Sequence, residues 1–178
     1  MSLSAEMQAL FATPEAPALG PGPRAGVASI DEIEAKLRKG AVAGRRKNLV
    51  RALVLLWHDR LDAAHEIVQD LENADGSYIH AILHRREPDY SNAKYWFRRV
   101  GRHACFIELA RRVGSLLEAE ADGALRARLL PQGQWDSFQF VDLCESVAGK
   151  ARDGLAARLR RVQQIEFVVF LEYLLEAN

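Results

Sequence analysis

Apolar residues recur along most of the chain at the spacing of one face of an α-helix. In residues 45–59, for example, Val50, Leu53, Val54 and Trp57 occupy positions i, i+3, i+4 and i+7. No stretch shows the sustained alternation of β-branched and polar residues that predicts a strand. We therefore predict an all-α fold. The predicted helices cover residues 29–40, 45–59, 59–71, 77–87, 90–101, 105–120, 136–149 and 153–177.

The N-terminal segment lacks this periodicity and is rich in Pro, Ala and Gly. Such a composition buries too little apolar surface to offset the entropy that is lost on ordering. We expect residues 1–28 to form a mobile arm, in which Met7, Leu10 and Phe11 could make one short turn that docks elsewhere. Residues 29–178 are predicted to form a single all-α domain.

The chain contains an internal repeat with a shift of 29 residues. With this shift, Ala64 falls on Ala93 and Val68 falls on Phe97. A small residue followed four positions later by a larger one lets two helix backbones approach closely while the space beside them is filled. The pattern predicts an irregular helical-repeat architecture of antiparallel helix pairs over residues 29–103.

Two resemblances follow from this region. The motif Tyr90-x-x-Ala93-x-x-x-Phe97 resembles the second-helix pattern of tetratricopeptide-like repeats, over about residues 48–101. The block WHDRLDAAH…YIHAILHRREPDYSNAKYWFRRVG is similar to an uncharacterised family of bacterial and fungal proteins with no assigned activity. The first resemblance implies stacked helix pairs, and neither implies a mechanism.

The closing helices, residues 104–178, end in a strongly apolar segment. In residues 153–177, apolar side chains lie on more than one helix face, so this helix must be covered on several sides. Two arrangements remain open. The helix packs over the helix pairs of its own chain, or it forms the seam between two subunits, so we expect a monomer or a homodimer.

The charges are balanced, with 24 Lys+Arg and 24 Asp+Glu, which provides no general attraction to nucleic acid or to anionic membranes. We expect neither of these partners, and no apolar run approaches the length of about 20 residues that a spanning helix needs. Cys105 and Cys144 form no CxxC pair, so we interpret them as buried thiols of a cytoplasmic protein. No GxSxG, Walker or GxGxxG sequence supports nucleophilic or nucleotide-dependent catalysis.

All five histidines fall within 46 residues, from His58 to His103. His80, His84 and Glu87 share one face of a predicted helix, and His58 takes the position of Glu87 in the 29-residue alignment. We expect that His58, His80, His84 and Glu87 could hold a divalent transition metal, zinc or iron. The competing interpretation is structural, in which these histidines cap helices or bond to backbone carbonyls.

Arginines close to these histidines widen the candidate site. Arg forms charge-assisted, bidentate hydrogen bonds to carboxylates and phosphates. We expect a binding module whose groove takes a small anionic ligand or a peptide. The candidate ligand-binding residues are His58, His80, His84, Glu87, Arg85, Arg86 and Arg98. The alternatives are a metal-dependent hydrolase or oxygenase that uses the metal set, and a structural interaction protein without a small ligand.

Overall fold

A computed structural model describes residues 5–22, 24–40, 42, 44, 46–150 and 153–176. Within these residues the regular secondary structure is helical and no strand forms, which confirms the all-α prediction. The α-helices are α1 (Ala5–Gln8), α2 (Ile30–Lys39), α3 (Lys47–Trp57), α4 (Leu61–Val68), α5 (Ala74–Arg86), α6 (Tyr90–Val100), α7 (Cys105–Ala119), α8 (Gly123–Leu129), α9 (Ser137–Ser146) and α10 (Gly154–Glu176). Two short 3-10 helices are η1 (Ala9–Phe11) and η2 (Pro131–Gly133).

Side-chain caps fix where α2 and α5 begin. In α2, the Ser29 hydroxyl accepts a hydrogen bond from the Glu32 N–H at 3.2 Å, and the Glu32 carboxylate accepts one from the Ser29 N–H at 2.7 Å. Asn73 caps α5 by accepting from the Gly76 N–H at 2.7 Å. The helix therefore begins earlier than predicted and contains Gly76, where an added Cβ would lie 2.4 Å from the Leu71 carbonyl oxygen.

Helices α3 and α4, and then α5 and α6, form two neighbouring helix pairs. Equivalent positions of the internal repeat are buried to the same degree. Ala64 and Ala93 are fully buried, as is Val68, and its counterpart Phe97 is 2% exposed. The small residues therefore lie in the interior between the helices, and the repeat itself stays a prediction. The tetratricopeptide-like resemblance itself stays a prediction.

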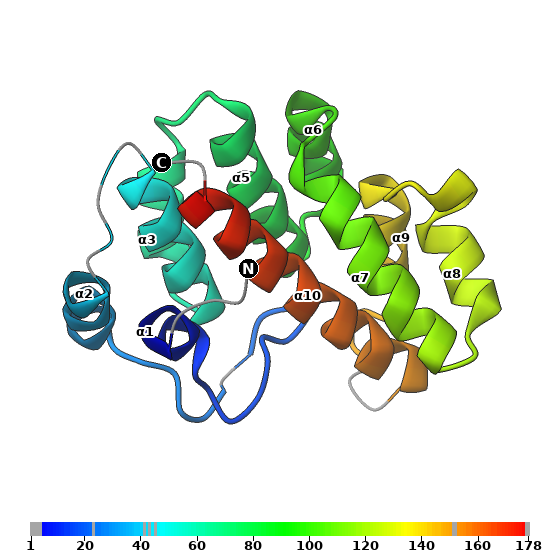
Figure 1. Ribbon diagram of the computed structural model, residues 1–178, viewed down its shortest axis with the longest axis horizontal. Helices are drawn as coiled ribbons and strands as arrows, with labels where there is room; N and C mark the ends of the chain where they lie inside the picture. The colour runs from blue at the N-terminus through cyan, green and yellow to red at the C-terminus, as the bar shows by residue number, and fades with distance from the viewer. Residues whose placement is uncertain are drawn as a thin grey trace.

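Helix α10 crosses the middle of the molecule and contacts α3 on one side and α7 and α9 on the other (Figure 1). Its Phe167, Phe170 and Leu171 side chains are fully buried. Helix α10 thus packs against helices of its own chain, as in the first of the two arrangements that the sequence left open, and the choice between a monomer and a homodimer stays a prediction. Helix α8 was not predicted, since its seven residues are too few for a periodicity.

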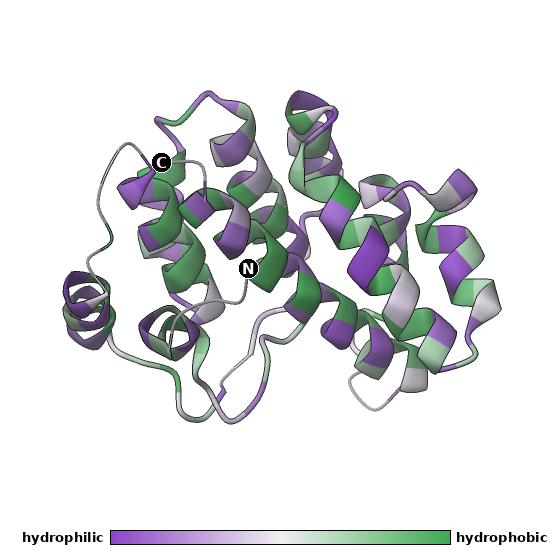
Figure 2. Cartoon of the chain, viewed as in Figure 1, coloured by the Kyte–Doolittle hydropathy of each residue, from purple (hydrophilic) through white to green (hydrophobic). Residues whose placement is uncertain are grey.

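Hydrophobic residues concentrate along the inner helices, as Figure 2 shows for α3 in contrast to the mostly hydrophilic α2. From Leu49 to Trp57, every residue of α3 is buried except the half-buried Arg51. None of the described helices combines the length and the apolar character that crossing a membrane would require.

Part of the N-terminal segment packs against the domain, and the mobility expected of residues 1–28 as an arm stays a prediction. Leu10 is fully buried, and the Phe11 ring stacks on Trp57 with the two centroids 4.4 Å apart. The Trp57 indole N–H also donates a hydrogen bond to the Thr13 hydroxyl at 3.1 Å. The docked turn that the sequence allowed is therefore the part of the segment that anchors it.

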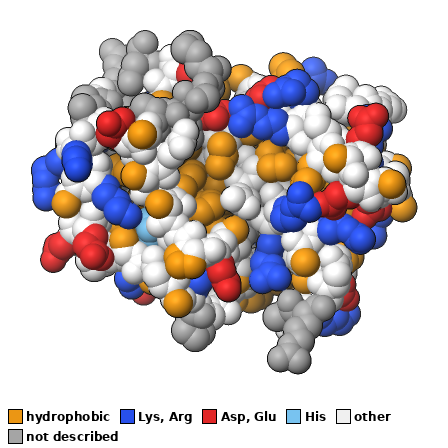
Figure 3. All heavy atoms as spheres, turned by 60° about the horizontal axis from the view of Figure 1, so that its bottom comes forward, with side chains coloured by type: hydrophobic (Ala, Val, Ile, Leu, Met, Phe, Trp, Pro, Cys, Tyr) orange, Lys and Arg blue, Asp and Glu red, His pale blue; other side chains and the backbone are white. Residues whose placement is uncertain are grey.

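Charged side chains of both signs are interspersed around the face drawn in Figure 3, and hydrophobic side chains gather near its middle. Among the described residues of the whole molecule several charged side chains are paired, for example Arg112 with Glu172 at 2.5 Å. On this face, therefore, acidic and basic side chains are mixed and do not form large patches of one sign.

Candidate metal centre

Three histidines from two neighbouring helices meet at one place. His65 lies on α4, and His80 and His84 lie one turn apart on α5. The rings of His80 and His84 are parallel with centroids 5.2 Å apart, and the His65 ring meets both edge-on at 4.8 and 5.6 Å. One possible ligand nitrogen from each residue lies within 4.8 Å of the other two. We call this set the histidine cluster.

His80 is held in the interior of the cluster without a full set of polar partners. Its side chain stacks on the Trp96 ring with centroids 3.9 Å apart, which fixes its plane. It is 3% exposed, and its Nδ1 has no hydrogen-bond partner within the described structure. Burial, reinforced by His65 and His84, lowers the pKa of His80 to about 4. The ring is therefore neutral at neutral pH and keeps a free lone pair.

His84 has a neighbour at each ring nitrogen. Its Nδ1 lies 3.0 Å from the Glu87 carboxylate, an ion-pair distance without the alignment of a hydrogen bond. Its Nε2 lies 3.2 Å from the Asn92 side-chain nitrogen. Burial lowers the pKa of His84, although the Glu87 and Asp89 carboxylates oppose that effect. This imidazole is therefore also mostly neutral at neutral pH.

The histidine cluster fits a transition-metal ion. Neutral imidazoles bind Zn²⁺, Fe²⁺ and Ni²⁺, and a tetrahedral ion with bonds of about 2.0–2.1 Å sets its ligand nitrogens about 3.3 Å apart. The spacing of up to 4.8 Å exceeds this value by about 1.5 Å, so the three imidazoles have to move closer together to share one ion. Three protein ligands leave one position of the tetrahedron open.

Comparison of the chain with protein-family models, with curated proteins and with solved structures finds no match. The expected kinship with an uncharacterised bacterial and fungal family therefore stays a prediction.

His58 does not join the histidine cluster, which corrects its place in both candidate sets. The residue is fully buried. Its Nε2 donates a hydrogen bond to the Leu10 carbonyl oxygen at 2.9 Å, and its Nδ1 accepts one from the Ala28 N–H at 3.1 Å. With both ring nitrogens engaged, His58 has no lone pair for a ligand. It ties the N-terminal segment to the end of α3.

Arg85 is fully buried and faces α10, so it cannot line a solvent-facing groove. Its guanidinium donates to both oxygens of Glu166, at 3.1 and 2.5 Å, and to the Gln163 side-chain oxygen at 3.2 Å. The Tyr78 hydroxyl donates to the same carboxylate at 3.2 Å. Burial opposes the charge of Arg85, but Glu166 outweighs it and raises the pKa of the guanidinium.

The other two candidate arginines also lie outside the histidine cluster. Arg86 is 2% exposed and donates to Asp59 Oδ1 at 2.5 Å, to the Ala18 carbonyl oxygen at 3.2 Å and to the Leu56 carbonyl oxygen. Arg98 is exposed on α6 and is not part of the cluster. The predicted groove of His and Arg side chains is therefore corrected, because two of its arginines are interior.

His65 belongs to the histidine cluster although it was not among the candidate residues expected from the sequence. Glu87 was among those candidates and lies outside the cluster. His65 directly follows the buried Ala64 and so flanks the inner face of α4. Because α4 packs against α5, that flank comes beside His80. The position next to an inner-face alanine was the signal available in the sequence.

Proposed function

We propose that this protein binds one divalent transition-metal ion through His65, His80 and His84, with a fourth position open to water or a small anionic ligand. The observation that carries this proposal is the convergence of three imidazoles from two helices within 4.8 Å. An anion oxygen binds readily at an open metal position. We therefore propose that the small anionic ligand expected from the sequence binds at the metal and not among the arginines.

Glu87 supports this assignment from outside the coordinating set. Carboxylates commonly hold a metal-binding histidine by its second ring nitrogen and so fix its orientation and basicity. The Glu87 carboxylate lies 3.0 Å from His84 Nδ1, which assigns Nε2 to the metal. Binding then replaces the 3.2 Å contact between Nε2 and the Asn92 side chain.

The set of donors restricts the choice of metal. Nitrogen-only ligation by three imidazoles suits Zn²⁺, Fe²⁺ or Ni²⁺ and does not suit Mg²⁺ or Ca²⁺, which prefer oxygen. The open position is also what a metal-dependent hydrolase or oxygenase would use. Binding is proposed first, because Glu87 is paired with His84 and the carboxylate of Asp89 is engaged by the Asn92 N–H at the start of α6.

Titration of protein purified without a His tag or chelator tests the proposal. We expect one Zn²⁺ or Ni²⁺ per chain by elemental analysis and a rise in Tm. A ligand that is present at 100 times its Kd stabilises the folded state by about 2.7 kcal/mol. Mg²⁺ serves as the matched control and should leave Tm unchanged. Absence of bound metal and a constant Tm with Zn²⁺, Ni²⁺ and Fe²⁺ would reject the proposal and favour a purely structural cluster.

A further inference from the structure

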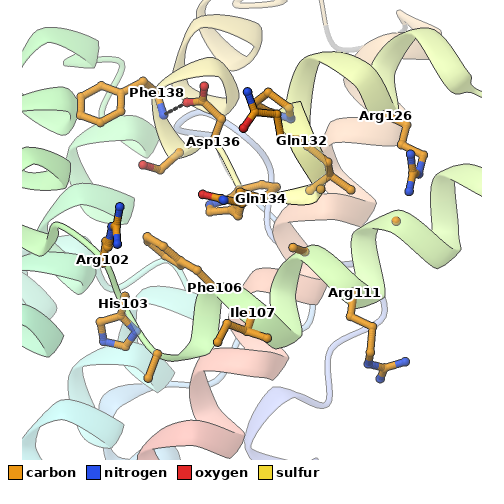
Figure 4. A pocket seen from close by; sticks show the side chains of 18 of the residues that line it. Arg102, His103, Phe106, Ile107, Arg111, Arg126, Gln132, Gln134, Asp136 and Phe138 are labelled. Atoms are coloured by element: carbon orange, nitrogen blue, oxygen red, sulfur yellow. Dashed lines mark hydrogen bonds between the residues drawn. The ribbon is translucent and has the colours of Figure 1, made fainter.

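A second feature, independent of the histidine cluster, is a groove between α7 and the segment from α8 to the start of α9 (Figure 4). Its volume is 1240 Å³, and its lining includes residues from Gly101 to Phe138. None of the three clustered histidines lines it. Any occupant of this groove is therefore separate from the proposed metal ion.

The floor of the groove is an apolar strip on one face of α7. Ile107, Ala110 and Gly114 follow one another at the spacing of a helix face. Ile107 is 81% exposed. Phe138 is 37% exposed on the opposite side. The groove thus offers uncovered apolar surface from both walls.

The wall opposite α7 is built by a tight turn. Gln132 and Gly133 both have positive φ, 54° and 78°, and the Asp136 N–H donates to the Leu129 carbonyl oxygen at 3.0 Å. The Asp136 carboxylate accepts from the N–H groups of Phe138 and of the next residue at 3.0 and 2.9 Å. These bonds hold the wall in place before anything binds, which limits the entropy lost on association.

The side chains of Trp135, Arg102 and Arg126 bring donors to the groove that no partner among the described residues engages. Trp135 is 8% exposed, and its indole N–H lacks a hydrogen-bond partner within the described structure. Arg102 and Arg126 lie at opposite ends of the groove (Figure 4), are exposed, and have no ion pair among the residues that the structure describes. By contrast, Arg111 is paired with Glu108 at 2.7 Å. A ligand that pairs with these side chains has to bring acceptor oxygens and negative charge.

We propose that this groove binds an acidic amphipathic helix of a partner protein. Helix-in-groove recognition uses apolar anchors at i, i+3, i+4 and i+7, which would pack on Ile107 and Phe138. Carboxylates on the polar face pair with Arg102 and Arg126 at the two ends, and one oxygen accepts from the buried Trp135 indole.

The dimensions favour a helix over a small molecule. Typical small-molecule pockets enclose about 300–1,000 Å³, and this groove is larger at 1240 Å³. The lining stretch of α7 from Phe106 to Glu118 is about 18 Å long at 1.5 Å per residue. A bound helix of three to four turns, of about the same length, matches that span.

A displayed library of 16-residue peptides tests the proposal. The peptides carry fixed Leu at i, i+3, i+4 and i+7, and the other positions are drawn equally from Glu, Lys, Ser and Ala. Selection on the parent protein should enrich Glu over Lys, and the enriched peptides should bind less tightly as salt increases. Enrichment of Lys, no preference between Glu and Lys, or no enrichment at all would overturn the proposal.

Variants locate the binding surface. The double variant Arg102→Glu/Arg126→Glu should bind the enriched peptide at least tenfold more weakly than the parent, as measured by fluorescence anisotropy. We expect the same loss of affinity for Ile107→Glu. Arg128→Glu is the matched control, because Arg128 is an exposed residue of α8 that does not line the groove. All four positions are exposed, so these variants should keep the parent's fold. Equal affinity for the parent and for the groove variants would contradict the assignment.

Discussion

Glu166→Ala is expected to lower the free energy of unfolding by about 3–5 kcal/mol. The carboxylate and its partner Arg85 are both fully buried, and two guanidinium N–H groups donate to it at 3.1 and 2.5 Å. The variant leaves the Arg85 charge in the interior without a counter-ion and removes an acceptor from the Tyr78 hydroxyl. This loss is a large share of the free energy of unfolding of a typical domain, which is about 5–15 kcal/mol.

Urea denaturation followed by circular dichroism measures this loss. Glu172→Ala is the matched control, because Glu172 lies on the same helix and pairs with Arg112, whose side chain is 29% exposed. We expect that control to cost about 1 kcal/mol or less. Arg85→Met/Glu166→Leu, which removes both charges, should recover much of the lost stability. A loss for Glu166→Ala as small as that for Glu172→Ala would show that the buried pair does not contribute as described.

His80→Ala is expected to weaken Zn²⁺ binding by about 100-fold or more, because it removes one of three coordinating imidazoles. His65→Ala and His84→Ala should show similar losses. Glu87→Gln should weaken binding less, by about 10-fold to 100-fold, since it affects only the orientation and basicity of His84. Isothermal titration calorimetry on protein freed of metal measures each Kd.

His58→Ala is the control for these variants. It also deletes a buried imidazole, but one that bonds to Leu10 and Ala28 outside the histidine cluster. We expect it to lower Tm and to keep the parent's affinity for Zn²⁺. Equal affinity of His80→Ala and the parent, or an equal loss in His58→Ala, would place the metal elsewhere.

Much of the fold could be predicted because its signals are local. The capping box of Ser29 and Glu32 lies within four residues of the chain, and so does the N-cap of α9 at Asp136. The repeat predicted that Ala64 and Ala93 lie on the inner faces of their helices, and both are fully buried. Helix α8 and the start of α5 were missed, because one is short and the other places a glycine in its first turn.

The candidate site was predicted only in part, because it depends on contacts between distant segments. Helical spacing placed His80 and His84 together, but it could not show that α4 brings His65 beside them. Nor could it show which segment covers each residue. Leu10 covers His58, and Glu166 meets Arg85 from a position 81 residues away. Residues that share a helix face were therefore assigned to one site when the fold divides them.

X-ray absorption at the zinc K edge, on protein loaded with one equivalent of Zn²⁺, would show directly which atoms coordinate the metal. We expect three imidazole nitrogens at about 2.0–2.1 Å and one further light-atom ligand. The imidazole contribution should fall to two in His84→Ala and stay at three in His58→Ala. A shell of oxygen ligands alone, or an unchanged spectrum in His84→Ala, would contradict a metal site formed by His65, His80 and His84.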